Sequence, residues 1–316
     1  MWIVKYKPKT LDEMIGNVHI INKVRLMIQS RRFQHMILCG SSGCGKTSLV
    51  DLIIEALLPK DKLEEALFYC STCDDRSVQV LRDKLHDFVP KRISLPSEIP
   101  KIIVFKRADH LSESVQQTMR RLMDVYSQDA FFIFICNSLS GIIESIQSRC
   151  SILQWHPIHI EEYRELIARI TFHEKNMSIS SKGIELLYHL SHGGDLRWTV
   201  NYLEVLSLVN HVITEDMIKE FCISPYYQQL EMILQLISEK KIGSHLSIIQ
   251  MLYNHGMNGI DLLIGLGDMV LLSSLFSDAI KIKMIQEIGI THGRFSSSFD
   301  HFLLFYNLLF SLQKLI

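Results

Sequence analysis

A glycine-rich segment followed by a lysine and two hydroxyl side chains is the strongest chemical signal in the sequence. Residues 40–48 read Gly-Ser-Ser-Gly-Cys-Gly-Lys-Thr-Ser, which satisfies the pattern G-x4-G-K-[ST]. An apolar run, Met36–Cys39, precedes this segment, and apolar residues at helical spacing follow it. In this setting the glycines let backbone N–H groups face a phosphate, and the N-terminus of the following helix adds partial positive charge. The sequence therefore predicts a nucleotide site.

Two side chains of this loop have separate expected tasks. Lys46 is long enough to reach the β- and γ-phosphates of a nucleotide, and the Thr47 hydroxyl can bind Mg²⁺. The expected ligand is ATP or ADP. The residues predicted to surround its phosphates are Gly40, Ser41, Ser42, Gly43, Cys44, Gly45, Lys46, Thr47 and Ser48.

The elements that must position this loop alternate between short apolar runs and segments of helical period. The apolar runs are Met36–Cys39, Leu67–Cys70, Ile102–Phe105, Phe131–Cys136 and Ser151–Trp155. Strands that alternate with helices predict a parallel α/β sheet. After His156 the pattern is helical and we expect no further strands, with Asp195 as the N-cap of a helix over Leu196–Val209. We therefore expect an α/β core over residues 1–155, a small helical lid over 156–222 and an all-helical domain over 223–316.

Composition limits the class of protein. The 316 residues carry 33 basic and 34 acidic side chains, a formal net charge of −1, so a globally basic nucleic-acid coat is excluded and any DNA contact must come from a local patch. No apolar run is long enough to span a bilayer, so we expect no membrane partner. The seven cysteines lack the spacing of a disulfide framework or a zinc site, which indicates reduced thiols in a soluble intracellular protein.

Several further motifs, taken in order along the chain, resemble the small subunits of replication factor C, the AAA+ sliding-clamp loader. Asn137 follows an apolar strand as in sensor 1, Ser148-Arg149-Cys150 matches the SRC motif, and Gly194-Asp-Leu-Arg197 resembles sensor 2. The other resembling segments are residues 2–11, 15–17, 73–82 and 116–121. The resemblance implies an AAA+ P-loop core, a helical lid and a helical collar over residues 223–316.

The resemblance also implies roles for residues that contact the nucleotide. Ile3 and Ile15 would line an adenine pocket, a task suited to apolar side chains. Asn137 would orient the attacking water or the γ-phosphate, and Arg197 would touch the γ-phosphate from the lid.

Partners follow from the same resemblance. Arg149 would be an arginine finger that acts on a neighbour's nucleotide, which implies a hetero-pentameric ring with other AAA+ subunits. Arg76 and Arg82 would bind phosphates of primer–template DNA, although a merely solvated helix face is an alternative for both. The implied partners are these subunits, the sliding clamp and DNA, and the implied location is the nucleus, or a cytoplasmic replication site if the source is viral.

The chain departs from the family pattern at the Walker B strand. The family has Asp-Glu-Ala-Asp after four apolar residues, whereas this chain has Lys106-Arg107-Ala108-Asp109. The first carboxylate should hold Mg²⁺ and the second should polarise water, so we expect this chain to bind nucleotide without appreciable hydrolysis and to bind Mg²⁺ weakly. Two outcomes remain open for Lys106 and Arg107: they take over part of the metal's role, or they turn into solvent.

Two other functions compete with a non-hydrolysing clamp-loader subunit. The first is an active AAA+ DNA-dependent ATPase, such as a helicase loader or a branch-migration motor; the lost carboxylates and the SRC motif argue against it. The second is a structural scaffold that has also lost nucleotide binding, against which the intact loop, Asn137 and Arg197 argue.

Overall fold

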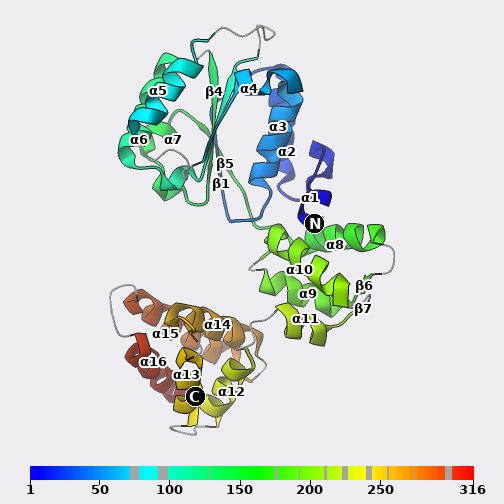
Figure 1. Cartoon of the computed structure of the whole chain (residues 1–316). Helices are drawn as coiled ribbons and strands as arrows, with labels where there is room; N and C mark the ends of the chain where they lie inside the picture. The colour runs from blue at the N-terminus through cyan, green and yellow to red at the C-terminus, as the bar shows by residue number, and fades with distance from the viewer. Residues whose placement is uncertain are drawn as a thin grey trace. The chain divides into compact units, whose positions relative to one another are not determined.

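The computed structural model describes most of the chain and divides it into two compact units, Met1–Cys222 and Ile223–Ile316 (Figure 1). The described residues are 1–71, 78–91, 99–127, 129–174, 177–191, 193–209, 212–222, 227–239, 244–254, 256–273, 275–295 and 301–316.

A parallel sheet forms the centre of the first unit. Its strands are β1 (Met36–Cys39), β2 (Leu67–Ser71), β3 (Lys101–Lys106), β4 (Ala130–Cys136) and β5 (Ser151–Gln154). They are hydrogen-bonded in the order β2-β3-β4-β1-β5, and every described pair is parallel. Each strand coincides with one of the apolar runs to within two residues at either end. The predicted fold class, a parallel α/β core followed by helices, is confirmed.

Helices cover both faces of this sheet (Figure 1). One face carries α2 (Val18–Ser30) and α3 (Lys46–Leu57), and the other carries α5 (Val78–Phe88), α6 (Glu113–Val125) and α7 (Glu144–Gln147). Successive residues of a strand point to opposite faces, so Ile102 and Val104 pack with Ile53 of α3. Ile103 and Phe105 pack in the second core, toward α6. Because both faces are covered, the strands read as continuous apolar runs.

The remaining elements of the sheet-bearing part are short. They are α1 (Trp2–Lys5), η1 (Leu11–Glu13), η2 (Lys60–Lys62), α4 (Leu63–Ala66), η3 (Ala108–His110) and η4 (Leu139–Gly141).

A buried lysine joins the start of β3 to the end of α5. The Lys101 side chain is 7% exposed, and its ammonium donates hydrogen bonds to the carbonyls of Phe88, Val89 (3.0 Å) and Lys91 (2.6 Å). Burial lowers the pKa of Lys101. The last carbonyls of a helix lack partners within the helix, so this lysine supplies donors that the backbone cannot.

Replacing Lys101 by methionine should therefore lower the free energy of unfolding by about 1–3 kcal/mol, because the carbonyls stay buried without a donor. Lys60→Met, at an exposed position, is the matched control and should change it little. Urea unfolding of both variants measures the difference, and equal midpoints would contradict this role of Lys101.

The first unit continues with helices α8 (Ile160–His173), α9 (Ser181–Leu190), α10 (Leu196–Val209) and α11 (Glu215–Cys222). Asp195 caps α10 as predicted, because its Oδ1 accepts the backbone N–H groups of Arg197 (2.9 Å) and Trp198 (3.0 Å). The expectation of no strand after residue 156 was wrong. Strands β6 (Ser178–Ile179) and β7 (Val212–Ile213) form a parallel pair, each too short for a sequence pattern to reveal it.

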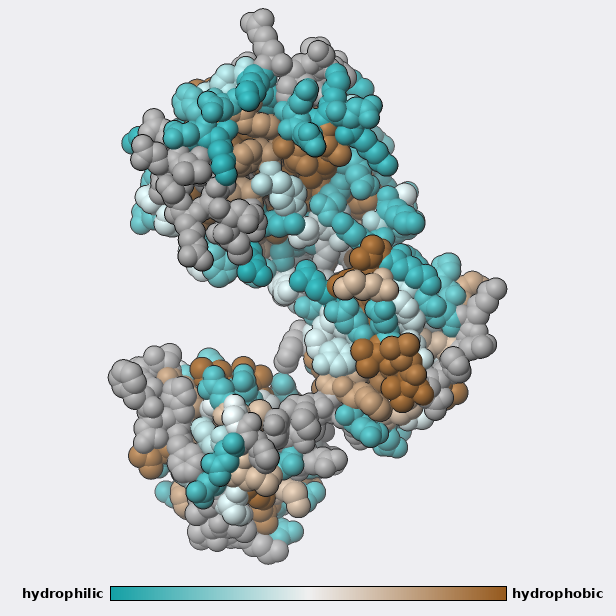
Figure 2. Space-filling model, viewed as in Figure 1, coloured by the Kyte–Doolittle hydropathy of each residue, from teal (hydrophilic) through white to brown (hydrophobic). Residues whose placement is uncertain are grey.

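Apolar side chains are also exposed on this helical segment. They are Val205, Leu208, Val209, Val212 and Phe221, with exposures from 40% to 83%. Figure 2 shows apolar atoms gathered over the region of α9–α11, beside a largely hydrophilic surface over the sheet. Exposed apolar patches occur more often on surfaces that bind another protein than on surfaces that stay in solvent.

The second unit is helical throughout its described residues. Its helices are α12 (Tyr227–Ser238), α13 (Ser244–Asn254), α14 (Gly259–Leu272), α15 (Asp278–Phe295) and α16 (His301–Leu315). They enclose a core in which Leu234, Leu263 and Phe305 are fully buried. Among the helices over the described residues, none combines the length and the apolar character needed to cross a membrane.

Candidate functional site

A large pocket lies at the carboxyl ends of β1, β3 and β4, within the first unit. Its volume is about 1130 Å³, which is ample for a nucleotide beside the roughly 300–1,000 Å³ of ordinary ligand pockets. The predicted nucleotide contacts that line it are Ile3, Ile15, Ser42, Gly43, Cys44, Gly45, Lys46, Thr47, Ser48, Asn137 and Arg197. Gly40 and Ser41 do not line the pocket; they contribute their carbonyls to the interactions of Lys46.

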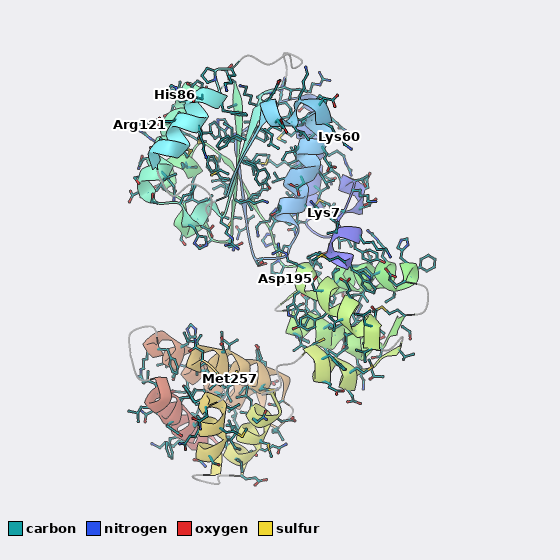
Figure 3. All side chains as sticks on the ribbon, viewed as in Figure 1. Lys7, Lys60, His86, Arg121, Asp195 and Met257 are labelled. Atoms are coloured by element: carbon teal, nitrogen blue, oxygen red, sulfur yellow. The ribbon has the colours of Figure 1, made fainter. Side chains whose placement is uncertain are left out.

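Two glycines of the loop have no room for a side chain. Gly40 passes so close to Trp155 that a Cβ would lie 2.7 Å from its carbonyl oxygen. Gly43 has a φ of +72°, and a Cβ there would lie 1.9 Å from Oδ1 of Asp195. The residue that caps α10 therefore also contacts the phosphate loop, and Figure 3 shows Asp195 where the sheet-bearing part adjoins the helical segment.

Lys46 joins the phosphate loop to the end of β4. Its ammonium donates to the carbonyls of Gly40 and Ser41, both at 2.6 Å, and lies 3.4 Å from Oδ1 of Asn137. Burial lowers the pKa of Lys46, with thiols and Asp109 acting in the opposite direction. The side chain therefore lies folded on its own loop, within reach of Asn137.

Asp109 holds the turn that carries Asn137. One of its carboxylate oxygens accepts the backbone N–H groups of Asn137 (3.0 Å) and Ser138 (3.3 Å). Asp109 does not line the pocket. This carboxylate therefore positions Asn137 and does not replace the missing Walker B carboxylates.

Lys106 and Arg107 both line the pocket at the end of β3. The Lys106 side chain is half-buried, and its ammonium lies over the Tyr69 ring, 4.4 Å from the centroid. Arg107 is exposed and has a φ of +51°. The sequence left two outcomes open for Lys106. The contact with Tyr69 excludes the one in which this side chain turns into bulk solvent.

The oxygen donors of this pocket do not fit Mg²⁺. Mg²⁺ requires octahedral oxygen ligands, commonly including a carboxylate near the phosphates. At the end of β3 the pocket presents two cations, and Thr47 contributes only a hydroxyl. The carboxylates that line the pocket are Asp12, which pairs with Arg25, and Glu13, which accepts the N–H of Lys9. No group of three metal-ligating side chains occurs among the described residues.

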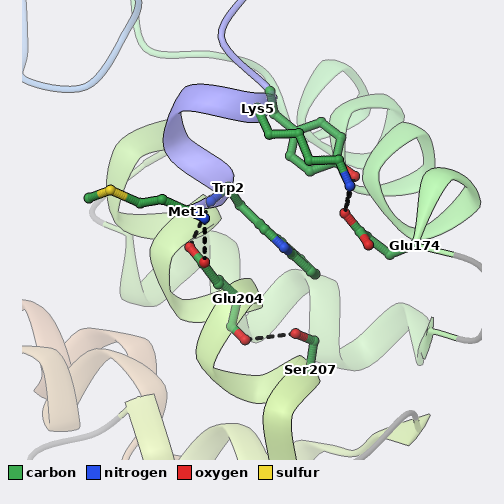
Figure 4. Close-up of polar contacts among 7 residues, drawn as sticks. Met1, Trp2, Lys5, Glu174, Glu204 and Ser207 are labelled. Atoms are coloured by element: carbon green, nitrogen blue, oxygen red, sulfur yellow. Dashed lines mark hydrogen bonds and ion pairs between the residues drawn. The ribbon is translucent and has the colours of Figure 1, made fainter.

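The N-terminal helix that carries Ile3 is bound to the helical segment by two glutamates (Figure 4). Glu204 of α10 pairs with the terminal ammonium (3.1 Å) and accepts the backbone N–H of Trp2 (2.8 Å). Glu174, just after α8, pairs with Lys5 and accepts the Tyr6 hydroxyl (2.6 Å). These contacts fix one wall of the pocket. Sequence reasoning missed them because the partners lie 168 to 203 residues apart.

These contacts predict a pH dependence. Hydrogen bonds from Lys5 and Tyr6 hold the pKa of Glu174 below its ordinary value. A carboxyl whose pKa is lower in the folded state stabilises the fold above its unfolded pKa, about 4.3, and loses this contribution as the pH falls through the folded value. At pH 7, Glu174→Gln should cost about 0.2–1 kcal/mol, the range for exposed ion pairs. Thermal unfolding should show this difference shrinking below pH 4; a constant difference would contradict the assignment.

Arg149 lies away from the nucleotide pocket, directly after α7. Its Nε donates to Oδ1 of Asp124 on α6 (2.6 Å), its Nη2 lies 3.4 Å from Oδ2, and its Nη1 donates to the carbonyl of Ser145 (2.8 Å). The hydrogen bond from Arg149 lowers the pKa of Asp124. The structure therefore does not bring Arg149 to this chain's own pocket.

The two arginines predicted to bind DNA are not tested by the structure. Arg76 lies outside the described residues. Arg82 lies on α5, whose backbone is described there, but its side chain is not among the parts that the structure describes.

Comparisons with known proteins agree with this architecture. Residues 36–158 match the model of the ATPase family associated with various cellular activities (AAA). Replication factor C subunit 4 of Saccharomyces cerevisiae is 26% identical over 99% of this chain and 96% of its own length. The replication factor C small subunit of Saccharolobus solfataricus is 27% identical over 95% of this chain and 90% of its own.

A solved structure shows the same fold. The RuvB Holliday junction branch migration motor of Thermotoga maritima superposes with a TM-score of 0.55 at 16% identity, covering 82% of this chain and 87% of RuvB. The phosphate loop, the sheet order and the near full-length relatives lead to one conclusion. Residues 36–158 match the AAA ATPase family, and over nearly its full length the chain is similar to replication factor C small subunits.

Proposed function

We propose that this chain is a subunit of a clamp loader, which places a sliding clamp on primer–template DNA, and that it binds ATP or ADP without hydrolysing it appreciably. Its near full-length relatives are named replication factor C subunits, which supports the first part. The observation that carries the second part is a complete phosphate loop facing Lys106 and Arg107 in one pocket.

The absence of hydrolysis follows from the charges near the γ-phosphate. The attacking water needs a group that orients it and accepts its proton, and in this class of reaction the developing charge is also neutralised by a carboxylate-bound metal. Lys106 and Arg107 offer the attacking water no carboxylate, and their positive charges repel a divalent cation. Asp109 cannot substitute, because its carboxylate holds Asn137 and Ser138.

In this proposal the three parts of the chain have separate tasks. Residues 1–155 bind the nucleotide, residues 156–222 form a lid whose Arg197 contacts the γ-phosphate, and residues 223–316 form a collar that joins the subunits. Arg149 acts on the nucleotide of a neighbouring subunit, which is consistent with its position outside this chain's own pocket. The exposed apolar side chains of the lid would be covered by another subunit. Arg76 and Arg82 would contact DNA phosphates, and the complex would act in the nucleus.

Comparing the purified chain with the double variant Lys106→Asp/Arg107→Glu tests the absence of hydrolysis. The native chain should bind ATP and return it intact, and the double variant should regain some turnover, above all when assembled with its neighbours. Steady turnover by the isolated native chain, stimulated by DNA, would contradict this proposal and favour an active motor. A P-loop variant such as Lys46→Ala identifies any contaminating ATPase.

A further inference from the structure

We propose that the Lys106 ammonium takes the place of the nucleotide's metal ion, so that this pocket binds nucleoside triphosphate in its metal-free form. This inference rests on the proposed function, because it requires that the pocket bind a nucleotide at all.

The register of the sheet places Lys106 on the face of the phosphate loop. It is the last residue of β3 and pairs with Ser71 of β2 and Ile135 of β4. Side chains two residues apart lie on the same face of a strand, so Lys106 shares a face with Val104, which packs in the core beneath α3. Helix α3 begins with Lys46 and Thr47. The ammonium therefore projects from β3 on the side where Thr47 would hold a metal.

The immediate surroundings hold Lys106 in place without neutralising it. Its ammonium lies over the face of the Tyr69 ring, a contact that orients a cation and leaves its charge intact. Asp51, the acidic residue of α3 one turn beyond Thr47, already pairs with Lys7 at 2.5 Å; Figure 3 labels Lys7 beside this helix. Among the described residues, no carboxylate lies within ion-pair distance of Lys106. Its positive charge therefore remains available to an anion.

The balance of charge in the pocket favours the free nucleotide over its Mg²⁺ complex. Free ATP carries more negative charge than the complex, and Lys46, Lys106, Arg107 and Arg197 all face the pocket. A divalent cation placed among these groups would meet repulsion on several sides, with the Thr47 hydroxyl as its ligand from the phosphate loop. The pocket therefore complements the charge of the triphosphate directly, because the Lys106 ammonium stands where Mg²⁺ would otherwise bind.

Isothermal titration of the chain with ATP, once with millimolar Mg²⁺ and once with EDTA, tests the inference. The affinity in EDTA should equal or exceed the affinity in Mg²⁺. Lys106→Gln keeps a polar side chain, one atom shorter and without the charge, and should weaken binding in EDTA roughly tenfold or more, the loss expected for one charge-assisted hydrogen bond. Lys106→Arg should retain most of the affinity, and Lys60→Gln, at an exposed site, should retain all of it.

The double variant Lys106→Asp/Arg107→Glu should reverse the dependence and bind ATP tightly only with Mg²⁺. Native binding that requires Mg²⁺ would overturn this inference and leave the proposed function standing. Unchanged binding of Lys106→Gln in EDTA would also overturn it. If the folded native chain binds no ATP in Mg²⁺ or in EDTA, the proposed function itself is overturned.

Discussion

Replacing Arg149 by alanine should slow ATP hydrolysis at the neighbouring site of the ring by about 10³- to 10⁵-fold, the effect of removing an arginine finger. In the proposed function the Arg149 guanidinium would stabilise the charge that develops on the transferred phosphoryl group, and an alanine offers nothing to that charge. The measurement is single-turnover hydrolysis in a reconstituted ring in which the neighbour is the only subunit able to hydrolyse ATP. Because the change lies in a different chain from the reacting nucleotide, the neighbour's own ATP affinity should change far less than its rate.

Two further variants separate the finger from a structural role. Arg149→Lys keeps the positive charge but lacks the planar fork of donors, so its rate should also fall substantially. Asp124→Asn removes the anionic partner of Arg149 in the free chain and should cause a smaller loss, because the guanidinium itself remains. A ring that assembles with Arg149→Ala and hydrolyses ATP at the native rate would contradict the assignment of the finger.

Replacing Lys46 by alanine should weaken nucleotide binding to this chain by roughly 10- to 100-fold, the loss expected when a charged hydrogen-bond donor is removed from a buried site. Lys46 also links the carbonyls of Gly40 and Ser41 to Asn137, so its removal loosens both the loop and the end of β4. Titration with ATP in EDTA measures the effect, and Lys60→Ala provides an exposed control. Thermal unfolding without nucleotide shows how much of the loss comes from the fold.

The same Lys46 variant distinguishes a nucleotide-binding subunit from a scaffold. A ring that contains Lys46→Ala should load clamps more slowly than the native ring, because the lid of this chain no longer responds to a bound nucleotide. Loading at the native rate, with nucleotide absent from this chain, would show that the chain acts as a scaffold.

The sequence predicts the sheet and the phosphate loop because both depend on local patterns. A strand buried on both faces must be apolar throughout, which is why Phe131–Cys136 could be placed to within one residue. The loop depends on glycines at fixed spacing before a helix. The pair β6 and β7 escaped prediction because two residues carry no periodicity.

The parts of the site that could not be predicted depend on contacts between distant segments. Whether Lys106 faced solvent or the pocket depended on Tyr69, which lies on a different strand. The contact of Asp195 with Gly43 joins the N-cap of α10 to the loop before α3, and no local pattern predicts it. The capping role of Asp195 itself could be predicted from the sequence. The role of Asp109 likewise depends on where β4 ends, since its partners are backbone N–H groups of the next turn.

Native mass spectrometry of the tagged chain, isolated from the cell that makes it in a buffer containing EDTA, tests the central claim most directly. We expect a complex in which this chain accompanies other AAA subunits, with one intact nucleotide retained by this chain after the metal has been removed. Recovery of the chain alone or as a homo-oligomer would contradict the clamp-loader assignment. Recovery within such a complex, but free of nucleotide, would contradict the claim that this pocket holds one.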